Sequence, residues 1–106
     1  MIEELQMHIE RVENICRLIE NREEYNEELT SYVGTLNTMV NDILACSQNQ
    51  AIPFFINEEF VLQVLKDIIY GMENKDSVFL LDTLRYGLLE IYYYTIEELQ
   101  NGEQNE

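Results

Sequence analysis

The residues of this chain that could do chemistry are its many acids, its two cysteines and its one histidine. All-helical nucleotide pyrophosphatases collect Mg²⁺ on paired acids, and acids three residues apart share one helical face. Three pairs have this spacing: Glu20 with Glu23, Glu24 with Glu27, and Glu73 with Asp76. Each pair lies in or beside an expected turn, and a chain with 21 acids produces such spacings by chance. A small metal-dependent phosphohydrolase is therefore an alternative function, not the leading one.

The histidine and the cysteines lack the partners that catalysis would need. His8 has Leu5 three residues before it, where a di-iron helical bundle has a glutamate. We interpret His8 as a partly buried residue on a helix flank, with a phosphorelay histidine as the alternative. Cys16 and Cys46 fall on apolar helical faces, so we expect both to be reduced, buried and too far apart for a disulfide. We predict no catalytic residue, no metal, no cofactor and no enzymatic activity.

Length and composition bound the class of protein. The 106 residues are 46% hydrophobic, which predicts one folded domain over residues 1–106, with a polar tail from about residue 102. The chain lacks the run of about 18 apolar residues that a membrane helix needs, and its acidic start does not fit a secretory signal. The net charge of −15 predicts repulsion from nucleic acids and anionic membranes. We therefore expect a cytoplasmic protein whose partner is a protein, and the charge favours a basic one.

Hydrophobic periodicity predicts four helices. Apolar residues recur three and four positions apart over residues 2–19, 25–47, 58–73 and 74–101. Amphipathic helices with short connections are typical of an antiparallel four-helix bundle, so we predict this all-α fold, with a proline-containing loop between the second and third helices. The last helix is apolar on more than one side, which predicts a central position. Its predicted core face has eight residues: Ser77, Leu81, Leu84, Leu88, Ile91, Tyr92, Thr95 and Leu99.

Single residues predict where these helices begin, end and approach one another. Asn57 and Asp76 precede periodic runs and are predicted N-caps, whereas Gly102 is predicted to end the last helix. Gly34 lies inside the second helix, where we expect close approach of a neighbouring helix.

The connection between the second and third helices contains the only proline. The polar residues 47–50 are predicted to end the second helix, and Pro53 is predicted to hold Ile52 out of the helical region. Phe54 and Phe55 are too apolar for a free loop, so we expect them to plug one end of the core.

Residues 72–89 carry acids and apolar or aromatic residues at every second position of one stretch. The seven residues of this pattern are Asp76, Val78, Leu80, Asp82, Leu84, Tyr86 and Leu88. With this pattern the segment resembles the last helix of a family of small, uncharacterised, acidic helical proteins of Firmicutes. Leu81, Arg85 and Gly87 depart from the family's pattern. The family is associated with motility and surface-glycosylation genes, so the resemblance implies an accessory role without an activity.

A second face of the last helix is the predicted interaction surface. Phe79, Tyr86 and Tyr93 lie roughly opposite its core face, and Asp82 and Glu90 lie beside them. Either a neighbouring element covers these rings, or they form an exposed stripe for a second chain. Aromatic residues are favoured anchors at protein interfaces, and the acids would set the orientation of the partner.

These observations together predict a non-enzymatic protein–protein interaction module, an adaptor or chaperone-like accessory protein. A purely structural homodimer is a further alternative, because a two-fold axis would let one stripe pack on its copy.

Overall fold

The computed structural model describes residues 1–49 and 53–104. In these residues three helices, α1 (Ile2–Glu20), α2 (Asn26–Ser47) and α3 (Glu58–Glu73), precede an uninterrupted succession of α4 (Ser77–Thr83), the π-helical turn η1 (Leu84–Leu88) and α5 (Leu89–Gln104). We call this succession the long helix. No strand occurs in the described part of the chain, so the predicted all-α class is confirmed. The first three helices lie within one residue of their predicted bounds.

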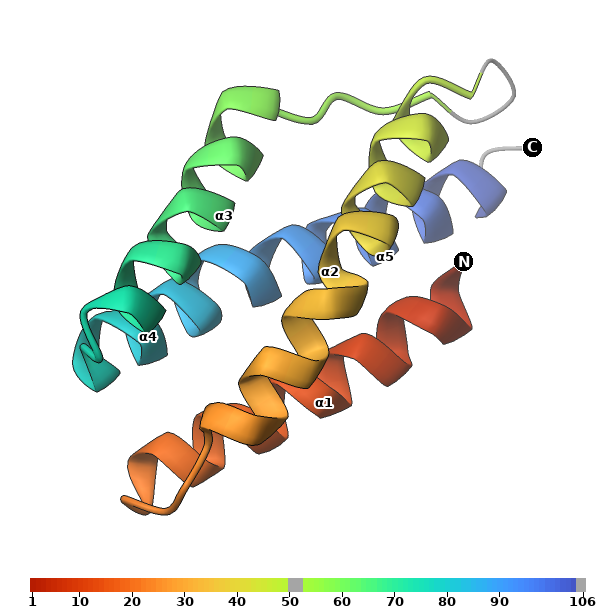
Figure 1. Cartoon of the computed structure of the whole chain (residues 1–106). Coiled ribbons are helices and arrows are strands. Elements are labelled where there is room, and N and C mark those ends of the chain that lie inside the picture. The colour runs from red at the N-terminus through yellow and green to blue at the C-terminus, as the bar shows by residue number, and fades with distance from the viewer. Residues whose placement is uncertain (50–52, 105–106) are drawn as a thin grey trace.

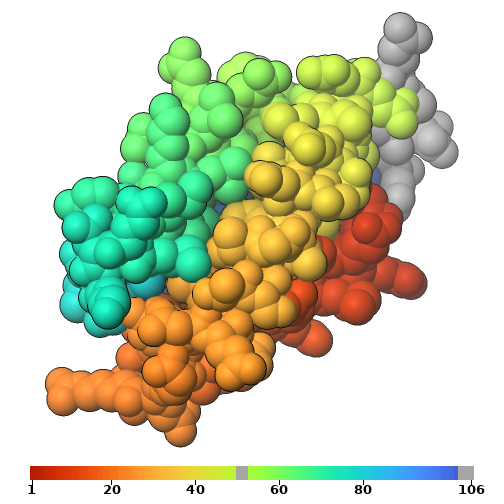
Figure 2. Space-filling model, viewed as in Figure 1, coloured from red at the N-terminus to blue at the C-terminus, as the bar shows by residue number. Residues whose placement is uncertain are grey.

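The long helix is the element on which the other helices pack. Figure 1 shows α2 turning back over α1 and crossing the long helix. α3 leads directly into α4, at the start of the long helix. α1 packs along α5, and α3 packs against α4 and η1. From the same side, α2 and α3 cover most of α5 (Figure 2). The long helix is therefore central, as its apolar sequence predicts.

The core consists of apolar residues from every helix, at helical spacing. Its largest fully buried side chains include two tyrosines and several leucines and isoleucines: Tyr32, Tyr92, Leu5, Ile15, Leu29, Ile43, Ile68, Leu80, Leu84 and Leu88. Each such residue contributes about 1.5–3 kcal/mol when it leaves water, so this face holds each helix in place.

Both predicted N-caps are confirmed. The side chain of Asn57 accepts a hydrogen bond from the backbone N–H of Phe60 at 3.1 Å, and that of Asp76 accepts from Phe79 at 3.0 Å. The predicted C-terminus is wrong, because α5 continues past Gly102 to Gln104. A glycine that does not adopt a left-handed conformation leaves a helix free to continue, and no glycine here has a positive φ.

Two helices end without the glycine that such ends favour. Arg22 and Lys75 follow α1 and α3 with φ of 57° and 52°, in the left-handed region. In both turns a backbone N–H donates to the carbonyl oxygen five residues earlier, at 2.9 Å: Glu23 to Leu18, and Asp76 to Gly71. This hydrogen bond defines the Schellman motif, so both tight turns are set by backbone hydrogen bonds rather than by glycine.

Two expectations about packing are wrong. A Cβ added at Gly34 would meet nothing within 4 Å, so no helix approaches there. Phe54 is half-buried against the core, as expected, but Phe55 is 77% exposed and plugs nothing. The predictions for Gln50 and Ile52 lie outside the described residues, whereas Pro53 is described and is not helical.

The close approaches occur at two other glycines. A Cβ on Gly71 would lie 2.7 Å from Cγ of Leu80, and one on Gly87 would lie 3.0 Å from Cγ2 of Val64. Both contacts lie between α3 and the long helix, so these glycines let the two helices come together.

The cap of the long helix gives a first prediction. Asp76→Ala removes the side-chain acceptor of the Phe79 N–H and should lower the free energy of unfolding by about 1 kcal/mol. Asp76→Asn keeps an acceptor oxygen and should retain most of that stability. Urea denaturation of the two variants measures the difference, and equal midpoints for alanine and wild type would contradict the cap.

Two glycine-to-alanine variants give a matched pair of predictions about stability. Gly34→Ala should stabilise the protein by about 1 kcal/mol, because alanine favours a helix and no atom obstructs the new methyl group. Gly71→Ala should destabilise it by about 1–3 kcal/mol, because the fully buried Leu80 cannot move away. Denaturation midpoints that move in the same direction for both variants would refute this account of α3 packing.

Candidate interaction surface

The π-helical turn decides which residues of the long helix face outward. Four fully buried residues of the long helix are spaced four apart: Leu80, Leu84, Leu88 and Tyr92. In a regular α-helix four residues turn through about 400°, so each step would drift by about 40° from the core. A wider π-turn absorbs this drift. Before the turn, the core face therefore uses Leu80 rather than the predicted Leu81, which is half-buried.

Four of the five residues predicted as an interaction surface are exposed: Asp82, Tyr86, Glu90 and Tyr93. The fifth, Phe79, is half-buried, and its ring makes an edge contact with Tyr70 of α3 at 5.5 Å between centroids. Tyr86 is the most exposed of the aromatic rings among the five, at 70%. The outer face of η1 and α5 runs between α1 and α3 and carries Tyr86, Glu90 and Tyr93. It is called the tyrosine face below.

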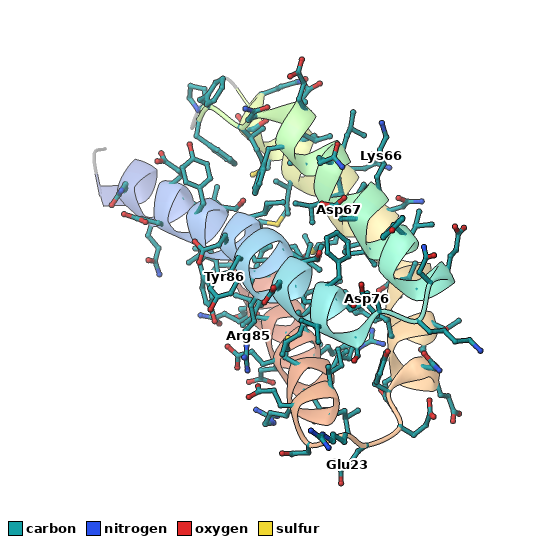
Figure 3. The ribbon with its side chains drawn as sticks, turned by 90° about the vertical axis from the view of Figure 1, so that its left-hand side faces the viewer. Glu23, Lys66, Asp67, Asp76, Arg85 and Tyr86 are labelled. Atoms are coloured by element: carbon teal, nitrogen blue, oxygen red, sulfur yellow. The ribbon has the colours of Figure 1, made fainter. Side chains whose placement is uncertain are left out.

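The border with α1 carries charges of both signs. The O–H of Tyr93 donates to Oε1 of Glu13 at 2.6 Å, and this hydrogen bond raises the pKa of the tyrosine. Arg85 forms an ion pair with Glu20 of α1. A hollow of about 360 Å³ lies between α1 and the long helix, lined by Glu13, Cys16, Arg17, Arg85, Tyr86 and Leu89. Figure 3 shows Arg85 and Tyr86 together on this flank of the long helix.

The border with α3 is more apolar. A shallow hollow of about 200 Å³ lies beside Tyr86, between Phe60 and Asp67 of α3 and Asp82 of the long helix. A second hollow, of about 280 Å³, lies farther along α5 between the residues before α3 and Tyr94. Figure 3 shows Asp67 on the flank of α3 next to the long helix. Tyr86 thus projects between hollows on two sides, which is the geometry of an anchor residue at an interface.

Three polar side chains meet beneath this surface. The hydroxyls of Tyr32 and Tyr92, both fully buried, are 2.5 Å apart, and Nδ1 of His8 lies 2.8 Å from the Tyr32 hydroxyl. Burial raises the pKa of Tyr32 to about 12, and that of Tyr92 rises further for the same reason. Both hydroxyls are therefore protonated at neutral pH.

The proton positions in this series of hydrogen bonds, from Tyr92 through Tyr32 to His8, follow from the number of donors. If Tyr92 donates to Tyr32 and Tyr32 donates to Nδ1 of His8, each hydroxyl proton has an acceptor, and His8 is neutral. Burial lowers the pKa of His8, and the charge of Arg11 lowers it further, against the opposing effect of Glu4. Arg11 also lies over the ring of Tyr32, 5.0 Å from its centroid. The position of His8 agrees with its predicted place on a helix flank, and in this arrangement of protons its Nδ1 accepts a hydrogen bond.

Three of the six acids in the spaced pairs make other contacts. Among the described residues, no three His, Cys, Asp or Glu side chains are grouped so that they could hold a metal ion. Glu20 pairs with Arg85, Glu24 accepts a hydrogen bond from the N–H of Asn26 at 2.8 Å, and Asp76 caps the long helix.

The two cysteines are free, and they differ in burial. Cys16 is buried, and burial raises the pKa of its thiol. Cys46 is only half-buried, so the expectation that both are buried is wrong for Cys46. None of the described helices combines enough length with enough apolar character to span a membrane.

Comparison with protein-family models, with curated proteins and with solved structures found no match to this chain. The resemblance of residues 72–89 to the Firmicutes family therefore stays a prediction.

The partly buried His8 gives a prediction about pH. The pKa of His8 is below 6.5 in the folded state, so the unfolded chain takes up the proton first as the pH falls. Its contribution to stability is fully present above pH 6.5 and is lost as the pH falls through the lower, folded-state pKa. Protonated His8 would also reverse the hydrogen bonds and leave the Tyr92 proton without an acceptor.

The control for this prediction is His8→Asn, whose amide oxygen can replace Nδ1 as an acceptor but does not titrate. The charged groups near His8, Glu4 and Arg11, remain in both proteins. The free energy of unfolding of the wild type, relative to the variant, should fall between neutral and mildly acidic pH. Parallel profiles from urea denaturation would show that His8 is not the titrating group.

Proposed function

We propose that this chain is a non-enzymatic cytoplasmic protein–protein interaction module, an adaptor or chaperone-like accessory protein. The observation that carries this proposal is the exposure of Tyr86 between hollows on two sides of the long helix. A tyrosine buries a large area with little loss of conformational freedom, so rings of this kind often dominate the binding energy of an interface.

The surroundings of Tyr86 support this function. Asp82, Glu90 and Tyr93 are exposed around it, so its ring is surrounded by polar groups that can orient a partner. The backbone beneath it is helical and packs on α1 and α3, so the contact residues are held in place before a partner binds.

The charge of the chain indicates the class of partner. A net charge of −15 favours association with a basic protein, and it repels nucleic acids and anionic lipids. The scaffold in this proposal is the antiparallel four-helix bundle predicted from the sequence, with its proline-containing loop before α3. The return of α2 over α1 supports that arrangement (Figure 1).

A homodimer through the same face is the second candidate, and one observation favours it. Glu13, Arg17 and Arg85 place both signs of charge in the hollow beside Tyr86. An interface between two identical surfaces around a two-fold axis needs such self-complementarity, because each group meets a group of its own patch.

A charge placed on the tyrosine face tests the function. Tyr86→Glu should abolish partner capture from the native host, or dimerisation if the partner is a second copy, because a carboxylate cannot fill the place of the ring. Val78→Glu is the matched control: Val78 is 71% exposed, on α4, and receives the same charge.

Affinity capture and sedimentation velocity measure the two outcomes, and circular dichroism checks that both variants keep their helices. If Tyr86→Glu behaves as Val78→Glu does, the tyrosine face is not the binding surface. If the wild type is monomeric and captures no protein, the proposal of an interaction module fails.

A further inference from the structure

A second surface next to the tyrosine face is a hollow of about 280 Å³. The loop before α3 forms one wall, with Phe55 and Ile56, and the first turn of α3 forms another, with Phe60 and Val61. Ile91 and Tyr94 of α5 complete its apolar lining, which we call the α3–α5 hollow. Phe60 is 45% exposed although it lines this hollow, so an apolar wall faces water in the free protein.

The contacts around the α3–α5 hollow hold it open. The O–H of Tyr94 donates to the carbonyl oxygen of Phe55, which ties the loop to α5. The ring of Phe54 makes an edge contact with Tyr94 at 6.3 Å between centroids. The cap formed by Asn57 fixes the first turn of α3. A site that is formed before binding costs less to occupy, because the loop is already ordered.

Acidic residues line and flank the hollow. Glu90 is the only ionised residue in its lining, and Glu58 and Glu59 lie in the first turn of α3. Glu98 and Glu97 act on Tyr94, whose pKa is raised first by burial and then by these two charges. An apolar hollow with a carboxylate in its wall and further acids around it complements an apolar group next to a cation.

We propose that the α3–α5 hollow binds a basic amphipathic helix, which places one large apolar side chain in the hollow and a lysine or arginine on Glu90. The hollow is near the lower limit of about 300 Å³ for small-molecule sites, and this size suits a single anchoring side chain. Helices that bind in this way present apolar anchors on one face, and the remaining positions are free to carry lysines. A second copy of this chain is a poor occupant, because it would bring 21 acids and only six bases to an acidic rim.

This inference goes beyond the tyrosine face: Glu90 and Phe60 border both surfaces, but Tyr86 does not line the α3–α5 hollow. The two surfaces therefore have separate tests.

The absence of tryptophan from this chain makes a direct experiment possible. The probe is a synthetic amphipathic helical peptide with one tryptophan on its apolar face and lysines on the other. Entry of the tryptophan into the α3–α5 hollow should shift its emission to shorter wavelength, and titration of that shift gives the affinity. The matched probe has glutamates in place of the lysines and should produce no shift. Added salt should weaken binding of the lysine peptide, because the acids at the rim are exposed.

Two pairs of variants locate the binding site. Glu90→Gln should weaken binding of the lysine peptide by about twofold to fivefold, the range of an exposed ion pair, and Glu10→Gln, an equal change of charge on α1, should weaken it less. Phe60→Ala removes a wall of the hollow and should weaken binding by about fivefold or more. Leu62→Ala is its control, since Leu62 is 55% exposed on the same helix and lies outside the hollow.

Equal binding of the two peptides, no emission shift, or equal effects of the site variants and their controls would overturn the proposal. Tyr86→Glu should not weaken peptide binding, because its carboxylate adds to the acids beside Glu90, so failure at the tyrosine face and failure at the α3–α5 hollow are distinguishable. If Phe60→Ala loses helicity by circular dichroism, Glu90→Gln alone decides the result.

Discussion

The hydrogen bond between the hydroxyls of Tyr32 and Tyr92 fixes how α2 lies on the long helix. Both rings are fully buried, and a buried hydroxyl without a partner costs about 1–3 kcal/mol. A slip of α2 by one residue would turn Tyr32 by about 100° and break this contact, so the hydrogen bond selects one register. His8 adds α1 to the same chain of hydrogen bonds. Three helices are thereby aligned by one polar cluster, whereas apolar packing alone tolerates several alignments.

The remaining helix, α3, is aligned by a different interaction. α3 approaches the long helix where Gly71 and Gly87 have no side chain, and Leu80 and Val64 fill the space that a Cβ would take. Gly87 lies within η1, where the helix is widened. The close approach of α3 and the rotation of the outward residues therefore occur at the same turn. The exposure of Tyr86 depends on this turn, because Leu84 and Leu88, two residues away on each side, lie in the core.

The sequence was sufficient to predict the all-α class, the bounds of three helices and two caps, because periodicity and capping are local properties. The π-turn has no clear local signal, since residues spaced four apart also occur in a regular α-helix, and the contact of Gly87 with Val64 of α3 within this turn is non-local. The pairing of Tyr93 with Glu13, 80 residues away, has no local signal either. The sequence predicts a close approach at Gly34, whereas the structure has close approaches at Gly71 and Gly87, because a glycine within a helix does not indicate which face a neighbour uses. Four of the five predicted surface residues are exposed because polar neighbours already mark the wet side of a helix.

The distribution of charge gives the two proposed surfaces different characters. Arg17 and Arg85 line the hollow beside Tyr86, and Arg85 pairs with Glu20 of α1. In the lining of the α3–α5 hollow, by contrast, Glu90 is the only ionised residue. The net charge of −15 is therefore not spread evenly over the molecule. A cationic partner that approaches from solution is drawn to the side with the uncompensated acids, because long-range attraction follows the local field rather than the total charge. The tyrosine face has both signs of charge, so under the proposed function its partner would be selected by short-range complementarity instead.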